Sequence, residues 1–291
     1  MKFDVGALYL PKAGSTVAEY EDSFSFSRKP RIAAVSDGAS DNFESRLWAY
    51  LLADAFVQRP PIGLTGPQLL DWVDSIAAEW RESIPLQDLS VFEEAKAELG
   101  SAATLVGLQL LPSSSRAVEG TWRCLALGDS CLFQITRGQL VVKLPLAKSA
   151  DFDIHPPLLS TSREKSELVI GQLVTDSGRW RAGDTFYLMT DAIAASFLLD
   201  YEKGGSPWET LFSLDKRSFA SFVNDRRARK LMRNDDVTVV TLSVRAPSAA
   251  RRRQLPGAST GAPRRPSLRA FAGPDPGDRP HPERGANAAK L

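Results

Sequence analysis

The sequence predicts an α+β fold in which two sheets pack face to face and helices cover their outer faces. Two observations support this prediction. Short runs of β-forming residues occur near the start, in the middle and at the end of the first 245 residues. Segments in which apolar residues have helical spacing follow the early strands and the late strands. Strands and helices are therefore grouped rather than strictly alternating, which is typical of α+β domains.

The N-terminal hundred residues hold the first strands and helices. The apolar run Ala33-Ala34-Val35 ends in Ser36-Asp37-Gly38, which predicts a strand followed by a turn. Apolar residues at helical spacing then predict three helices, over Glu44 to Val57, Gly66 to Ile84 and Glu93 to Leu99. Pro60-Pro61 ends the first of these helices.

After residue 100 the pattern changes to that of strands. The expected strands are short and rich in β-formers: Ala103 to Leu110, Trp122 to Leu127, Cys131 to Ile135, Leu140 to Leu144 and Thr185 to Met189. Two helices and a closing strand follow, over Asp191 to Leu199, Lys216 to Leu231 and Val237 to Val244.

Composition divides the chain at residue 246. Residues 246–291 hold eight Arg, one Lys and three acids, together with eight of the nineteen prolines, and no periodic pattern. We therefore expect one folded domain over residues 1–245 and a disordered basic tail over 246–291. With a formal net charge of +1 for the chain and +6 for the tail, the domain carries −5, which is not typical of a nucleic-acid-binding core. The arginine runs leave contact of the tail with an acidic partner or RNA open.

Cysteine count and hydropathy indicate a cytoplasmic protein. Cys124 and Cys131 flank a predicted tight turn and are too few for a disulfide framework, so we expect two free thiols. No segment approaches the roughly 20 apolar residues that span a bilayer. Met1-Lys2-Phe3-Asp4 does not begin a signal peptide.

Acidic residues recur at the ends of the predicted strands. They are Glu21, Asp22, Asp37, Asp129, Asp191, Asp235 and Asp236. Any one of them could cap a helix or start a turn. Strands of two packed sheets end along a common edge, however, and carboxylates that converge there lose hydration and repel one another unless cations are bound.

Oxygen ligands favour hard divalent cations, Mg²⁺ or Mn²⁺. A zinc site is not expected, because His occurs only at positions 155 and 281 and no Cys–His spacing is present. The sequence also lacks a Gly-x-Ser-x-Gly elbow, a Cys-x₅-Arg loop and a P-loop motif. No serine or cysteine nucleophile of those classes is therefore predicted.

Four blocks of sequence and one strand carry a family resemblance. They are Glu21-Asp22-Ser23-Phe24; Ala34-Val35-Ser36-Asp37-Gly38-Ala39; Leu125-Ala126-Leu127-Gly128-Asp129-Ser130; Leu188-Met189-Thr190-Asp191 with Asn234-Asp235-Asp236-Val237-Thr238-Val239-Val240; and the strand Ser101-Ala102-Ala103-Thr104-Leu105. In this order, over residues 1–245, the chain resembles the metal-dependent protein phosphatases of the protein phosphatase 2C family. It is most similar to a bacterial branch of that family.

The resemblance implies a four-layer αββα sandwich with a binuclear centre at one end, holding two Mn²⁺ or Mg²⁺ ions and, in some members, a third. The resemblance also implies a role for each predicted site residue. Asp37 would bridge the two ions, the Gly38 carbonyl would bind one of them, and Asp191 and Asp235 would bind the other. Glu21 and Asp22 would act directly or through water, Asp129 would help bind the third, weaker ion, and Asp236 would support the site.

The implied activity is hydrolysis of phosphoserine and phosphothreonine on proteins by a metal-activated water, without a covalent enzyme intermediate. The implied partners are a phosphorylated protein substrate and a cognate serine/threonine kinase. Neither a nucleic acid for the domain nor a membrane is expected.

Three positions depart from the family pattern. They are Val17, where many members carry a phosphate-binding arginine; Ala39, where some carry a histidine; and Ala192, where glycine usually follows the aspartate. Arg28, Lys29 and Arg31 are candidate substitutes for phosphate binding, although each is more typical of a surface residue. Two alternatives therefore stay open: a pseudophosphatase that binds phosphoproteins without turnover, and a different metal-dependent hydrolase.

Overall fold

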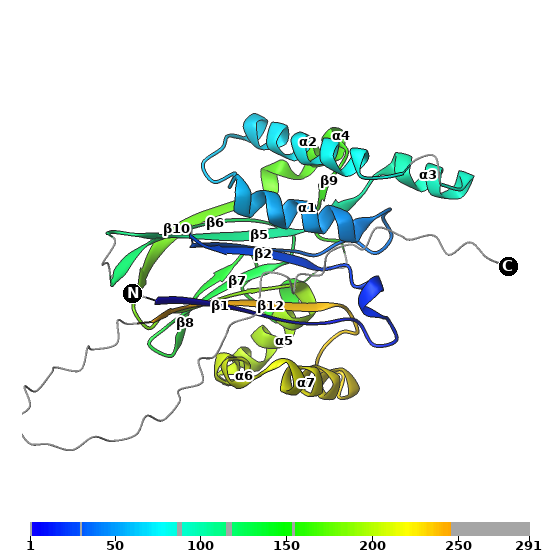
Figure 1. Ribbon diagram of the computed structural model, residues 1–291. Coiled ribbons are helices and arrows are strands. Elements are labelled where there is room, and N and C mark those ends of the chain that lie inside the picture. The colour runs from blue at the N-terminus through cyan, green and yellow to red at the C-terminus, as the bar shows by residue number, and fades with distance from the viewer. Residues whose placement is uncertain (1, 30, 86–88, 115–117, 153–154, 246–291) are drawn as a thin grey trace, which may run out of the picture.

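A computed structural model describes the protein over residues 2–29, 31–85, 89–114, 118–152 and 155–245, so the predicted tail lies outside the described residues. Two five-stranded antiparallel sheets form the centre (Figure 1). The first sheet has the spatial order β1 (Lys2–Leu10), β12 (Val237–Arg245), β11 (Thr185–Met189), β7 (Cys131–Thr136) and β8 (Gln139–Leu144). The second has the order β10 (Val174–Arg181), β6 (Glu119–Leu127), β5 (Leu105–Pro112), β3 (Arg31–Ser36) and β2 (Ser23–Arg28).

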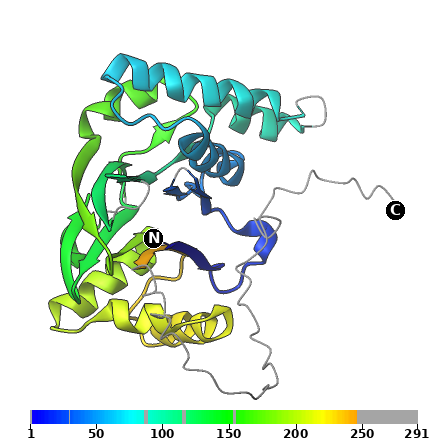
Figure 2. The ribbon, with the colours of Figure 1, turned by 60° about the vertical axis from the view of Figure 1, so that its left-hand side comes forward.

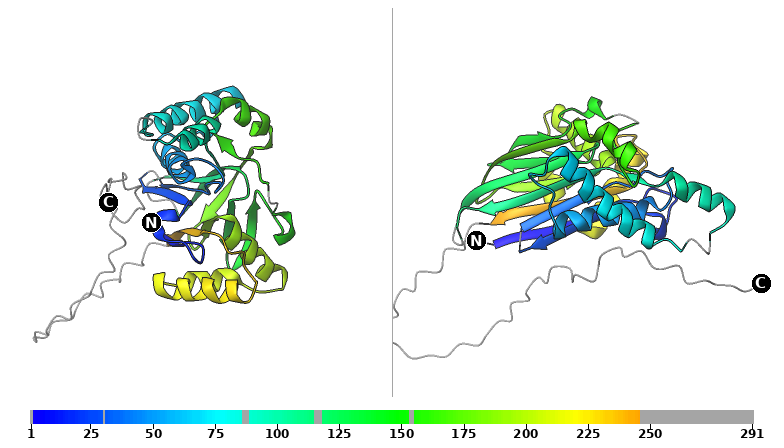
Figure 3. Two further views of the ribbon diagram at one scale, coloured as in Figure 1. Left: turned by 90° about the vertical axis from the view of Figure 1, so that its right-hand side faces the viewer. Right: turned by 90° about the horizontal axis from the view of Figure 1, so that it is seen from above.

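Helices cover the outer face of each sheet. The second sheet is covered by α1 (Ser45–Gln58), α2 (Gly66–Glu82) and α4 (Arg163–Val169), and the first by α5 (Asp191–Glu202), α6 (Pro207–Ser213) and α7 (Lys216–Ala228). Figures 2 and 3 show the same layers from other sides, with the blue and cyan helices opposite the yellow ones. The short α3 (Val91–Leu99) and the two-stranded pair β4 (Ala102–Ala103) and β9 (Leu159–Ser160) lie beside the sandwich. The predicted αββα sandwich is confirmed.

Burial of apolar residues holds the layers together. Trp48, Leu52 and Phe56 on α1 are fully buried against the second sheet. The Phe56 ring comes so close to β5 that a Cβ at Gly107 would lie 2.2 Å from it, so this strand position must lack a side chain. Truncating a buried aromatic residue such as Phe56 to alanine typically costs about 3–5 kcal/mol. The spacing had placed Leu47, Tyr50 and Leu51 on the packed face, but these side chains are only half-buried, so the predicted face of α1 was partly wrong.

Apart from the two-residue strand β9 and the short 3₁₀ turns, four described elements were not predicted from the sequence, namely β1, β10, α4 and α6. On β10 only Trp180 is buried, because the strand lies at a sheet edge, and its polar residues hide the strand pattern. On β1, Asp4 and Gly6 interrupt the run of β-formers. The other two are helices of seven residues, too short to show a helical period.

The two cysteines are free and buried, as expected. Among the described helices, none combines the length and the apolar character needed to cross a bilayer.

Candidate metal centre

Strand registers bring the predicted acids to one end of the sandwich. In the second sheet Ser23 pairs with Ser36. Asp22, which precedes β2, and Asp37, which follows β3, therefore lie side by side at the same end of the sheet. In the first sheet the start of β12 lies beside the ends of β1 and β11, which places Asp235 near Asp191.

Five carboxylates form what we call the acid cluster: Asp22, Asp37, Asp129, Asp191 and Asp235. Loss of hydration raises the pKa of Asp37 well above its usual range, and the charges of the other four members raise it further. The pKa of Asp129 is raised to about 7, first by burial and then by the Asp191 charge. These effects show that acids from both sheets lie within electrostatic reach of one another.

Asp22 joins the two sheets. Its Oδ2 accepts hydrogen bonds from the hydroxyls of Thr190 (3.0 Å) and Thr238 (2.7 Å), both of which belong to the first sheet's end of the cluster. The other oxygen, Oδ1, is buried and has no hydrogen-bond partner among the described residues. Burial and the Asp236 charge raise the pKa of Asp22 well above its usual range. An unpartnered buried carboxylate oxygen is costly unless water or a cation occupies the space beside it.

Asp191 is the first residue of α5, where the partial positive charge of the helix N-terminus favours an anion. It is 7% exposed. Arg233, on the loop between α7 and β12, forms an ion pair with its Oδ2. Burial raises the pKa of Asp191, and the Arg233 charge opposes that rise. Ala192, the departure from the family's glycine, is buried at the helix start, so its methyl group fits there.

Asp236 is bound mainly by backbone groups. Its two oxygens accept from the amides of Lys12 (2.7 Å) and Glu21 (2.7 Å), which attach the end of β1 and the segment before β2 to the start of β12. Asp235 Oδ1 accepts from the Asp236 amide at 2.9 Å. Both oxygens of the Asp236 carboxylate therefore have backbone donors.

Glu21 is engaged by three donors. Its carboxylate accepts from Lys12 Nζ (3.2 Å), Ser40 Oγ (2.5 Å) and Ser45 Oγ (2.7 Å). Beside it, Gly38 is packed so closely that a Cβ would lie 2.8 Å from the Ser45 carbonyl oxygen and 2.9 Å from that of Glu21. The glycine of the Asp-Gly block is thus required by the close approach of α1 and the Glu21 segment.

The donor chemistry of the acid cluster fits hard divalent cations. All predicted side-chain donors are carboxylate oxygens, the other four acids raise the pKa of Asp37, and Asp22 Oδ1 lacks a partner among the described residues. Within the described ranges, however, no three His, Cys, Asp or Glu side chains stand close enough together to hold an ion as they are placed. Ion binding would therefore require small side-chain movements, including release of Asp191 by Arg233.

The candidate phosphate-binding cations named from the sequence lie elsewhere. Arg28 pairs with Arg31 across the β2–β3 hairpin, at the opposite end of these strands from Asp22 and Asp37. Five residues of strand separate the two ends by about 17 Å. Arg31 instead lies over the Phe3 ring at 4.1 Å. None of these cations can reach the cluster.

Sequence reasoning missed several residues that shape this site: Lys12, Thr190, Thr238 and Arg233. A usable signal existed for Arg233, since it lies two residues before Asp235 in the last acidic block. A cation so close to a carboxylate at a strand end is a candidate partner for the cluster. The threonines are ordinary strand-end residues, and their roles depend on side-chain direction.

A comparison with sequence models of known families identifies the family of this chain. The sequence model described as "Protein phosphatase 2C" matches residues 18–233. The chain belongs to the protein phosphatase 2C family. The search of curated proteins found no match.

Solved structures share the protein phosphatase 2C fold. The photosystem II phosphatase PBCP is 14% identical with a TM-score of 0.53, and covers 84% of this chain and 99% of its own. The Mycobacterium tuberculosis serine/threonine phosphatase PstP/Ppp is 16% identical with a TM-score of 0.54 and the same coverage. A structure of the PstP catalytic domain in complex with two manganese ions has 16% identity, a TM-score of 0.51 and again the same coverage. At these identities the likeness shows the fold of this protein phosphatase 2C domain.

Proposed function

We propose that this chain is a metal-dependent protein-serine/threonine phosphatase that hydrolyses phosphoserine and phosphothreonine at the acid cluster. The observation that carries this proposal is the convergence of Asp37 with Asp22, Asp129, Asp191 and Asp235, each raising its pKa. A fold gains no stability from such a group of like charges. Membership in a phosphatase family supports a catalytic role for this cluster of carboxylates.

The proposed ion ligands are those that the family resemblance implies. Asp37, the Gly38 carbonyl, Asp191 and Asp235 would hold two Mn²⁺ or Mg²⁺ ions. Asp129, which is buried and lies within reach of the Asp191 charge, would serve a third ion. When bound, the cations supply an activated water and positive charge for the phosphoryl oxygens.

The chain's own residues position these ligands. Thr190 and Thr238 fix Asp22, and Arg227 Nη2 donates to the Asp235 carbonyl at 2.5 Å, which holds the loop before β12. Lys12, Ser40 and Ser45 hold Glu21 in the orientation from which it would act through water. Position 39 is alanine, so no imidazole is available there to protonate the leaving group.

The test is hydrolysis of p-nitrophenyl phosphate and of a phosphothreonine peptide, with and without added Mn²⁺. We expect turnover that depends on Mn²⁺ or Mg²⁺ and disappears with EDTA, because the donor set is made of oxygens only. Full activity in a metal-free preparation would exclude the metal-dependent mechanism. The physiological substrate would be a phosphoprotein, and a cognate serine/threonine kinase would supply it.

A second candidate is a pseudophosphatase that binds phosphoproteins without turnover. One observation favours it: the ion pair that Arg233 forms with Asp191 occupies a carboxylate that ions would need. Phosphopeptide binding without any Mn²⁺-dependent hydrolysis would select this candidate over the enzyme.

A further inference from the structure

Arg233 combines two properties that no other described cation combines. Among the described residues it is the one cation whose side chain is bonded to a carboxylate of the acid cluster, through Asp191. Its side chain is also 46% exposed, so the guanidinium is accessible from solvent. Lys12 is bonded to Glu21, outside the cluster, and Arg227 donates to backbone carbonyls.

The backbone beneath Arg233 is anchored on both sides. Met232 is buried against the apolar core under α5 and α7. The Asn234 amide group accepts from the Ala13 amide (2.7 Å) and donates to the Ala13 carbonyl (3.2 Å). Movement of the guanidinium therefore comes from the long side chain, which can shift its charge without refolding the loop.

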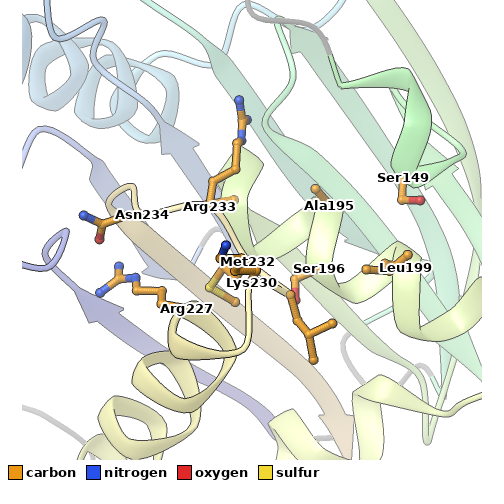
Figure 4. A pocket seen from close by; sticks show the side chains of 11 residues that line it. Ser149, Ala195, Ser196, Leu199, Arg227, Lys230, Met232, Arg233 and Asn234 are labelled. Carbon is orange, nitrogen blue, oxygen red and sulfur yellow. The ribbon is translucent and has the colours of Figure 1, made fainter.

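Arg233 also lines a cavity of about 560 Å³ beside the cluster. The cavity lies between α5 and the loop before β12, and its lining holds three cations, Arg227, Lys230 and Arg233, and no acid. Figure 4 shows the Arg233 side chain extending away from Arg227 and Asn234. Of these three cations only Arg233 forms an ion pair with the acid cluster, so it brings positive charge to the edge of an acidic site, where an anion is attracted that the carboxylates alone would repel.

We propose that Arg233 binds the phosphate group of the substrate. Its guanidinium pairs with Asp191 while no cation is bound, and it transfers to the phosphate once cations occupy that carboxylate. The geometry of an arginine suits this exchange, because carboxylate and phosphate both accept two parallel N–H bonds from the same planar group. The inference rests on the proposed function in one respect, namely that the phosphate belongs to a substrate.

The experiment measures binding of inorganic phosphate to the Mn²⁺-saturated full chain by calorimetry, together with Mn²⁺ binding alone. The variants are Arg233→Gln and Arg233→Lys, with Lys230→Gln as the matched control. Lys230 lies on the same loop and lines the same cavity, and among the described residues no carboxylate forms an ion pair with it. The control therefore removes the same charge without touching the cluster.

We expect Arg233→Gln to weaken phosphate binding and raise the KM for p-nitrophenyl phosphate by roughly 10- to 100-fold, the range for a charged hydrogen bond. Lys230→Gln should change either value less than about threefold, because the Lys230 side chain is exposed and its charge is screened by salt. Arg233→Lys should fall between wild type and Arg233→Gln, since it keeps the charge and loses the paired donors. Mn²⁺ should bind Arg233→Gln at least as tightly as wild type, because no guanidinium competes for Asp191.

Three outcomes would overturn the inference. They are equal phosphate affinity in Arg233→Gln and Lys230→Gln, no phosphate binding by the Mn²⁺-saturated wild type, and a loss of Mn²⁺ affinity that accounts for the whole effect of Arg233→Gln. Phosphate binding that depends on Arg233, in a wild-type protein that hydrolyses nothing, would support the inference and reject the proposed function.

Discussion

The acidic residues at the two ends of the sandwich have different surroundings. At the end away from the cluster, Asp4 is paired with Arg245 at 2.5 Å, and Asp184 accepts from Gln134 Nε2 (2.9 Å) and the Arg181 amide (3.1 Å). At the other end, Asp37 is surrounded by carboxylates. At the far end no acid is described as facing a cluster of other acids, although Asp184 Oδ1 lacks a partner among the described residues, whereas at the cluster end acids face one another even where some of them also accept hydrogen bonds.

The acids at the two ends are expected to contribute differently to the stability of the fold and to its function. Paired or hydrogen-bonded acids offset their own loss of hydration, whereas mutually repelling acids make the ion-free protein less stable. Sites kept for function commonly carry such a cost. Substitutions at the two ends should therefore change activity and stability in different directions.

The largest expected effect is on turnover. Asp37→Asn should lower kcat by roughly three orders of magnitude or more, because metal-assisted charge stabilisation contributes several kcal/mol. Asp191→Asn and Asp235→Asn should act alike, and Asp129→Asn more mildly. Steady-state kinetics at saturating Mn²⁺ measure this, with Asp4→Asn at the far end as the control. Wild-type turnover in Asp37→Asn would remove Asp37 from the site.

The next effect is on stability as a function of pH in EDTA. Asp129 is 4% exposed and its pKa is raised from 3.8 to about 7, so the folded state binds more protons than the unfolded state between these values. Stability should therefore fall as pH rises from about 4 to about 7, by at most roughly 4 kcal/mol from this group. Asp22 and Asp37 shift in the same direction.

Urea unfolding at pH 5 and pH 8 would measure that slope. Asp129→Asn should flatten it and raise the stability of the ion-free protein at pH 8. Asp4→Asn should leave the slope in place. Saturating Mn²⁺ at pH 8 should restore stability, by about 2.7 kcal/mol at a hundredfold excess over Kd. An ion-free protein that gains stability between pH 5 and pH 8 would contradict the uncompensated cluster.

A smaller effect is expected from the link between the sheets. Thr238→Val keeps the shape of the side chain, removes a donor from Asp22 and removes the partner of the buried Tyr20 hydroxyl. It should destabilise the protein by about 1–3 kcal/mol, the cost of a buried polar group that loses its partner. Thr241→Val, at a half-buried position on the same strand, is the control, and equal melting temperatures for the two variants would argue against the link.

The smallest effect is expected from truncation at Pro247. Residues 246–291 lack periodicity and are rich in Pro, Gly and Arg, so their removal should leave the melting temperature nearly unchanged. Thermal melts of the full and truncated chains would measure the difference. A drop of several degrees would mean that this segment packs on the domain.

The sequence predicted the fold where local pattern and burial agree. The strand Thr185–Met189 was predicted with its exact bounds, and α1 within one residue of each end, because apolar periodicity there reflects a packed face. The polar edge strand β10 shows how a strand escapes prediction when almost none of it is buried.

The candidate site was predictable to the level of which acids share an end of the sandwich. That step needs only strand ends and the layer arrangement. The direction of the side chains was not predictable from the sequence. Three contacts depend on it: Glu21 accepts from Lys12 and two serines, Arg233 pairs with Asp191, and Asp22 accepts from two threonines. These contacts join residues up to 216 positions apart in the chain.

The bond from Asp22 to Thr190 and Thr238 has a consequence for the order of assembly. It ties the two sheets at the end where ions would enter, with protein atoms alone. Protein atoms alone can thus set the spacing of the sheets there, and we expect that any bound ions would exchange in a chain that stays native. Amide hydrogen exchange at Thr238 should accordingly be as slow in EDTA as in Mn²⁺, apart from the change in global stability.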